Sequence, residues 1–97
     1  MITIEARDIR VGETKRLVLT PTDESGAAAT LQSLSVRRIR PDGSDMPALS
    51  LSDFQASGGQ YTGNISFDAA GVWTLRVDAT DALGNREIEE IRVLVLP

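Results

Sequence analysis

The C-terminal part of the chain constrains the fold most, because it has the pattern of a β-hairpin. Residues 67–97 read FDAAGVWTLRVDATDALGNREIEEIRVLVLP, and two runs of alternating apolar and polar residues flank the turn-forming sequence DALGN at 81–85. Such alternation on both sides of a short loop with Gly and Asn is typical of two antiparallel strands. We therefore expect strands at 72–80 and 86–96. This hairpin makes an all-β sandwich the favoured architecture.

The rest of the chain alternates strand patterns with clusters of turn formers. Pro, Gly, Asp and Ser, which favour tight turns, gather at 21–26, 41–44 and 57–59. The sequence contains no long helical periodicity and no internal repeat. We therefore predict a single domain over residues 1–97, an all-β, immunoglobulin-like antiparallel Greek-key β-sandwich of about seven strands. The further expected strands run from Ile2 to about residue 10, over 14–20, 32–40 and 60–67, and over a poorly alternating stretch at 47–51.

The alternation also predicts which side chains fill the core, because residues two apart on a strand share a face. In the strand at 32–40, Ile39 is out of phase with the inward residues before it. This slip predicts a bulge or bend near Arg37 and Arg38. The residues expected to point inward are Leu17, Leu19, Leu34, Val36, Tyr61, Gly63, Ile65, Phe67, Trp73, Leu75, Val77 and Ala79.

Composition argues against several classes of function. The 97 residues contain no cysteine and no histidine, which removes disulfides, thiolate metal sites and the commonest general base. We therefore expect no enzyme. The net charge of −4 argues against a nucleic-acid partner, because phosphates demand a basic face. No apolar stretch approaches the length of a membrane span. The first residues lack the basic and apolar regions of a signal peptide, so we expect the product to be made in the cytoplasm.

Two groups of residues with side-chain oxygen atoms are candidates for a site. Asp78, Asp81 and Asn85 offer the oxygen ligands that calcium prefers. We favour the alternative that Asp81 and Asn85 accept hydrogen bonds in a turn in which Gly84 has a positive φ. The second group could hold the paired carboxylates of a glycosidase, but acids in the turns of so small a domain rarely face each other in a cleft. We therefore assign no catalytic, cofactor or metal residue. The second group comprises Asp8, Glu13, Asp23 and Glu24.

The last strand is apolar on both of its faces, which makes its outer side a candidate interface. With Ile91, Val93 and Val95 in the core, Leu94 and Leu96 would lie outward. A sandwich strand with one side in water should alternate cleanly, and burying two leucines is worth roughly 3–6 kcal/mol. Two alternatives remain open: a partner chain covers these leucines, or the N-terminal segment or a loop of the same chain does.

The densest basic cluster consists of Arg37, Arg38 and Arg40, and it is the second candidate interface. On a strand Arg38 and Arg40 share one face, while Arg37 takes the other. One interpretation is a solvated edge strand that its charges keep soluble. The other pairs the cluster with an acidic surface, either on a neighbouring protein or on this chain, where the candidates are Glu87, Glu89 and Glu90.

Short phrases along nearly the whole chain resemble one known group of proteins. They are VGET at 11–14, TDESG at 22–26, PDG at 41–43, GQYT at 59–62 and AGVWTLRV at 70–77. This layout resembles the short immunoglobulin-like proteins of tailed bacteriophages and is similar to Ig-like modules of bacterial surface proteins. The pattern Asp68-x-x-Gly71-x-Trp73-x-Leu75 resembles the tyrosine corner of immunoglobulin domains. Trp73 stands in place of the corner tyrosine and Leu75 in place of the cysteine, so the corner hydrogen bond cannot come from a phenol.

The phage resemblance implies a non-enzymatic structural or accessory protein of a virion, such as a head decoration or a neck or tail component. Its partners would be capsid, neck or tail proteins and copies of itself, and its location the virion. The similarity to surface modules implies the alternative of an adhesive or carbohydrate-binding domain. Such a domain usually presents aromatic platforms to sugars, and here only Tyr61 and Trp73 qualify, both expected to point inward.

Overall fold

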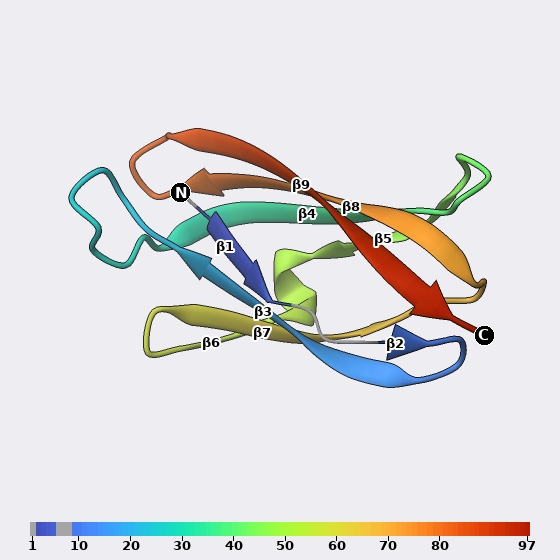
Figure 1. Cartoon of the computed structure of the whole chain (residues 1–97). Coiled ribbons are helices and arrows are strands. Elements are labelled where there is room, and N and C mark those ends of the chain that lie inside the picture. Colours follow the sequence, from blue (N-terminus) through green and yellow to red (C-terminus); the bar gives the residue numbers. More distant parts are fainter. Residues whose placement is uncertain (1, 6–8) are drawn as a thin grey trace.

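The structure, a computed structural model, describes residues 2–5 and 9–97 and shows an all-β chain (Figure 1). Its longer strands coincide with the runs of alternating apolar and polar residues, as the period of two along a strand requires. The elements are β1 (Ile2–Glu5), β2 (Ile9–Arg10), β3 (Thr14–Pro21), β4 (Leu31–Ile39), β5 (Asp45–Ser50), the short 3₁₀ helix η1 (Leu51–Asp53), β6 (Gln55–Ser57), β7 (Gln60–Ser66), β8 (Gly71–Asp81) and β9 (Arg86–Leu96).

The strands form two sheets that face each other across one core. One sheet has the order β1-β3-β7-β6 and the other the order β2-β9-β8-β4-β5. Within the described ranges every strand pair is antiparallel except β2 with β9, which is parallel. Figure 1 shows the sheet of β9, β8 and β4 lying over the sheet of β3 and β7. The longest ladder joins β8 to β9 over ten residue pairs, which confirms the C-terminal hairpin.

The core lies between the sheets and contains the inward residues named above for the earlier strands, whereas Ile91, also expected in the core, is only partly buried. Trp73 is its largest fully buried side chain. The indole packs edge to face against Phe67, with ring centroids 4.8 Å apart and planes inclined by 70°, a preferred geometry for aromatic pairs. Its Nε1 donates a hydrogen bond of 2.9 Å to the backbone carbonyl of Ala69. This hydrogen bond ties the indole at the start of β8 to the backbone of the loop before it.

The N-terminal strand differs from its prediction. In place of one strand from Ile2 to about residue 10, β1 pairs with β3 in one sheet and β2 pairs with β9 in the other. The chain thus contributes an edge strand to each sheet. β6 was not predicted at all, because its three residues are exposed and show no burial pattern. It lies at the edge of its sheet beside β7.

A register shift lies near Arg37, as predicted, but the bulge is in β5 and not in β4, where it was expected. Between Val36 and Arg38 the register with β5 shifts, so that β5 carries one extra residue. The extra residue falls beside Pro47, which has no N–H to give to a ladder and is therefore suited to a bulge. The register of β4 with β8 stays continuous over the same residues. As a result Arg38 keeps the inward phase of Leu34 and Val36.

Candidate functional site

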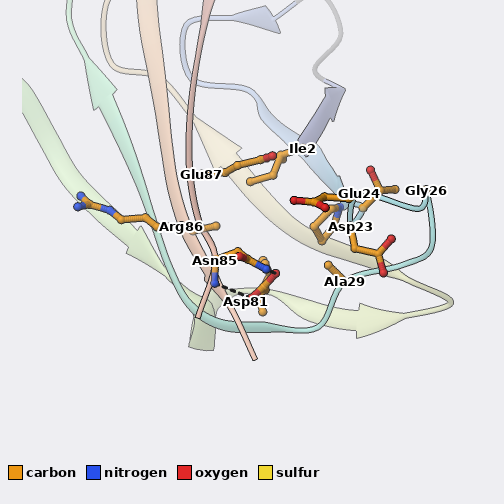
Figure 2. A pocket seen from close by; sticks show the side chains of 13 residues that line it. Ile2, Asp23, Glu24, Gly26, Ala29, Asp81, Asn85, Arg86 and Glu87 are labelled. Carbon is orange, nitrogen blue, oxygen red and sulfur yellow. Dashed lines mark hydrogen bonds between the residues drawn. The ribbon is translucent and has the colours of Figure 1, made fainter. Parts of the chain in front are cut away.

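A pocket of 510 Å³ opens at one end of the sandwich, between the β8–β9 turn and the loop that follows β3 (Figure 2). Apolar side chains from β1, β4 and β8 contribute to its wall, and most of its other lining residues are polar. Arg86 extends away from it, since its guanidinium pairs with Asp78 at 2.6 Å. The pocket is therefore acidic. Its lining residues are Ile2, Pro21, Thr22, Asp23, Glu24, Gly26, Ala29, Leu31, Ala79, Asp81, Asn85, Arg86 and Glu87.

Two aspartates at the pocket have the same structural role, each closing a turn. Oδ1 of Asp23 accepts hydrogen bonds from the backbone N–H groups of Ser25 and Ala27 at 2.9 and 3.0 Å. Oδ1 of Asp81 does the same with Leu83 and Asn85, at 2.9 Å each. The hydroxyl of Ser25 further lowers the pKa of Asp23, and the backbone of Asn85 lowers that of Asp81. Both carboxylates are thus occupied by their own turns.

The hydrogen bonds of the β8–β9 turn confirm the structural interpretation of Asp81. Its carboxylate accepts from the turn, and Gly84 has a φ of 88°, as that interpretation required. The amide of Asn85 donates to Asp81 at 3.1 Å, while Asp78 is held by Arg86. The three proposed oxygen ligands are therefore already engaged, Asp81 with Asn85 and Asp78 with Arg86. Among the described residues no group of three or more His, Cys, Asp or Glu side chains could hold a metal ion.

The acids considered for a glycosidase do not all meet at one site, as far as the structure describes them. Glu13 and Asp23 flank opposite ends of β3. Glu13 accepts a hydrogen bond from the backbone of Arg10 at 2.8 Å and pairs with Lys15 at 3.5 Å. These partners lower the pKa of Glu13. Asp23 and Glu24 do line the same pocket, but Asp23 is committed to its turn. Asp8 lies outside the described residues.

The arginine cluster does not lie on an edge strand, which corrects the first interpretation of it. β4 runs between β8 and β5. Arg37 pairs with Asp45 at 2.9 Å, and Arg40 pairs with Asp68 at 2.7 Å. Each of these contacts raises the pKa of the arginine. The carboxylates that pair with the cluster are thus two aspartates in or beside neighbouring strands, and not the glutamates of β9 that the sequence suggested.

Arg38 is buried, with only 7% of its surface exposed. Its Nη1 donates to the backbone carbonyl of Ser66 at 2.9 Å, and its Nη2 donates to that of Pro47 at 2.8 Å. Burial lowers the pKa of this guanidinium. Arg38 therefore connects β5 to β7 in the other sheet and is not a surface residue. The sequence signal for the burial of Arg38 was its position on the strand, two residues after the inward Val36, because residues two apart share a face.

The outer side of the β8–β9 ladder carries an exposed apolar pair, Val72 of β8 and Leu94 of β9. They face each other across the β8–β9 ladder, and 52% and 59% of their surfaces are exposed. Leu96 is half-buried beside β2. On the opposite face Val93 and Val95 are buried, as predicted. The sequence analysis placed Leu94 outward and missed Val72, whose cross-strand register with Leu94 can be known only from the paired structure.

The comparisons with known proteins show the fold alone. No protein-family model matches the chain, and no curated protein matches it. Among solved structures, the chain is similar to part of an engineered protein whose crystal structure was determined at 1.98 Å. The two share a TM-score of 0.70 and 20% sequence identity, over 100% of this chain and 20% of that one. The chain thus spans about a fifth of that protein's length. In the described part of the chain, no helix has the length and apolarity to cross a membrane.

Proposed function

We propose that the fold is an immunoglobulin-like Greek-key sandwich. The strand order supports this: the sheets β1-β3-β7-β6 and β2-β9-β8-β4-β5 correspond to the orders A-B-E-D and G-F-C-C′ of immunoglobulin domains, with β2 as a short additional strand beside β9. Trp73 supports it as well. Its N–H binds a backbone carbonyl four residues upstream, at the corner where the immunoglobulin tyrosine binds backbone in the same way.

The function proposed for this fold is protein–protein contact without catalysis. The observation that carries the proposal is the exposed pair Val72 and Leu94 on the outer side of the β8–β9 ladder. The core is already filled by the inner faces of both sheets, so these side chains are not needed to stabilise it. Apolar surface of this kind beside a sheet edge is a common site of association. The contact surface comprises Val72, Leu94 and the neighbouring part of β9.

The proposed setting is the virion of a tailed phage, as a head decoration or a neck or tail component. This setting rests on the resemblance of the turn-and-strand phrases to phage immunoglobulin-like proteins. Many copies on a symmetric particle would reinforce one another through avidity, so a modest surface would suffice. The alternative of a carbohydrate-binding surface module is less well supported, because Tyr61 and Trp73 are both buried and offer no aromatic platform.

The test is whether one exposed leucine controls assembly. The tagged chain is mixed with the virion proteins encoded by neighbouring genes, and the assembled material is separated by sedimentation. Leu94→Glu should abolish co-sedimentation, since it puts a charge into the proposed contact. Leu83→Glu is the matched control, because Leu83 is 84% exposed at the β8–β9 turn and should assemble like the wild type. Normal assembly of Leu94→Glu would refute the proposed contact surface.

A further inference from the structure

Over most of its length, one edge of β9 is not occupied by any strand that the structure describes. Among the described residues, β8 occupies one side along the strand, and β2 occupies the other side only at Val95 and Leu96. From Arg86 to Leu94 the second side of the β9 backbone therefore pairs with no described strand. An edge of this kind is a template for pairing with another strand.

The outer face of this edge carries a self-complementary series of side chains. Alternate residues along it are apolar, acidic, basic and apolar: Ile88, Glu90, Arg92 and Leu94. Ile88 is 42% exposed and Leu94 is 59% exposed. When such a series is laid antiparallel on a copy of itself, each acid meets a base and each apolar residue meets another.

We infer that β9 pairs with β9 of a second copy of this chain, in an antiparallel ladder about a twofold axis at Ile91. This inference rests on the proposed function, in which the outer side of β9 is a contact surface, and it names the partner. Residues directly opposite in an antiparallel ladder share a face. Glu90 of each copy then faces Arg92 of the other, and Ile88 faces Leu94. On the inner face Ile91 meets its own copy, and such a symmetric contact is the commonest form of homodimer.

The charges within the monomer leave this pairing available. Arg92 lies opposite Thr74 in the β8–β9 ladder, and it makes no ion pair within the described ranges. Glu90 makes one exposed ion pair, from its Oε1 to Arg76 at 3.1 Å. Its other carboxylate oxygen is left to accept from a neighbouring chain. Across the axis, Arg92 is the cation that lies within reach of it.

Other registers are less favourable on the same outer face. An axis at residue 90 sets Glu90 against its own copy, and an axis at residue 89 sets Arg86 against Arg92. An axis at Ile88 pairs Arg86 with Glu90, but it also sets Glu87 against Glu89 on the inner face. Like charges directly opposite destabilise a ladder. Only the axis at Ile91 pairs opposite charges on the outer face and avoids facing like charges on the inner one.

The position of β2 limits how far this ladder extends. Because β2 occupies the edge at Val95 and Leu96, the partner strand joins the ladder only from its Ile88 onward. The ladder thus covers residues 88–94 of both chains. An interface this short is small, and we expect a dissociation constant in the range of tens of micromolar or weaker.

The decisive experiment uses two charge variants and their mixture, followed by sedimentation velocity up to about 0.5 mM protein. Glu90→Arg sets two arginines against each other in its homodimer, and Arg92→Glu sets two glutamates against each other. Each variant alone should dimerise at least about tenfold more weakly than the wild type, which is about 1.4 kcal/mol. Mixed one to one, the two variants restore both opposite-charge pairs and should dimerise like the wild type. Arg16→Glu on β3, an exposed charge change in the other sheet, is the control and should leave dimerisation unchanged.

The axis is tested by cross-linking, for which the absence of native cysteine is an advantage. Ile91→Cys should form an intermolecular disulfide on mild oxidation, because the two sulfurs meet at the axis. Ile88→Cys, on the same strand, should not, since its copy lies six ladder positions away. Faster linkage of Ile88→Cys, or linkage of neither variant, would overturn the proposed register.

The failure of this inference is separable from that of the proposed function. A chain that stays monomeric at 0.5 mM, alone and in the variant mixture, overturns the self-pairing. If Leu94→Glu still abolishes assembly with the neighbouring virion proteins, the proposed function stands without it. If instead the chain dimerises as described while Leu94→Glu assembles normally, the self-pairing stands and the proposed function fails.

Discussion

Replacement of Trp73 by phenylalanine and by tyrosine separates the two contributions of its indole to stability. The side chain is fully buried, packs against Phe67, and donates to the carbonyl of Ala69. Phenylalanine keeps an aromatic ring in the same place but has no donor and a smaller volume. Tyrosine has the same ring as phenylalanine and adds a hydroxyl, which at an immunoglobulin corner binds backbone upstream.

The expected magnitudes follow from these contacts. Loss of the hydrogen bond, with the Ala69 carbonyl left unpaired, costs about 1 kcal/mol. The smaller ring leaves part of the indole volume empty, which costs about 1–2 kcal/mol. Trp73→Phe should therefore lower the free energy of unfolding by about 2–3 kcal/mol. Trp73→Tyr should recover about 1 kcal/mol of that loss, because its hydroxyl can donate to the same carbonyl. Trp73→Ala should cost about 3–5 kcal/mol, a large part of the 5–15 kcal/mol typical of a small domain.

The assay is chemical unfolding followed by circular dichroism, which does not depend on the tryptophan that is removed. Equal slopes of the three transitions would show that stability alone has changed. The wild-type protein should also show the blue-shifted fluorescence of a buried indole. Phenylalanine and tyrosine variants of equal stability would refute the corner hydrogen bond. A water-exposed emission spectrum would refute the whole core arrangement.

Two further predictions concern backbone packing and acid sensitivity. Gly63→Ala should destabilise the protein by about 1–3 kcal/mol in the same assay, because an added Cβ would lie 2.8 Å from the Phe54 ring. Ala56→Gly on the exposed β6 is the control. An unchanged unfolding midpoint for Gly63→Ala would contradict this packing. The turn aspartates have pKa values lowered by hydrogen bonds from Asn85 to Asp81 and from Ser25 to Asp23, so they contribute stability above about pH 4 that is lost as the pH falls through the lowered folded-state pKa. Asp81→Asn should therefore make the melting temperature fall less steeply below pH 4. A melting temperature that falls with pH as steeply as that of the wild type would argue against this contribution.

The sequence predicted the strands that are long enough to display a period of two. β7, β8 and β9 begin and end within a residue of the expected bounds, because one face of each packs in the core. β2 and β6 have two and three residues, too few for a pattern. Their existence depends on the strands beside them, β9 and β7, and such neighbours cannot be read from a local stretch of sequence.

The arginine cluster shows why charge alone misplaced a side chain. Arg38 was grouped with Arg37 and Arg40 because all three are basic. In the structure its position on the strand decides its direction, and the side chain is long enough to reach two backbone carbonyls. Those hydrogen bonds offset part of the unfavourable burial of its charge. The sequence pattern indicates that Arg38 points inward. It does not indicate the carbonyl acceptors of Ser66 and Pro47, because these residues belong to other strands.

The last strand contains apolar residues that folding requires and others that it does not. The core requires apolar residues only at the inward positions of β9, and Val93 and Val95 fill them. Leu94 and its cross-strand neighbour Val72 lie on the opposite face, where a polar pair would fold equally well and dissolve better. Packing gives no reason for these two exposed side chains, and contact with another chain is the role that we propose for them. The alternation of charge between Glu90 and Arg92 on the same face supports a second copy of the chain as the partner that we propose, because that series is complementary to its own reverse.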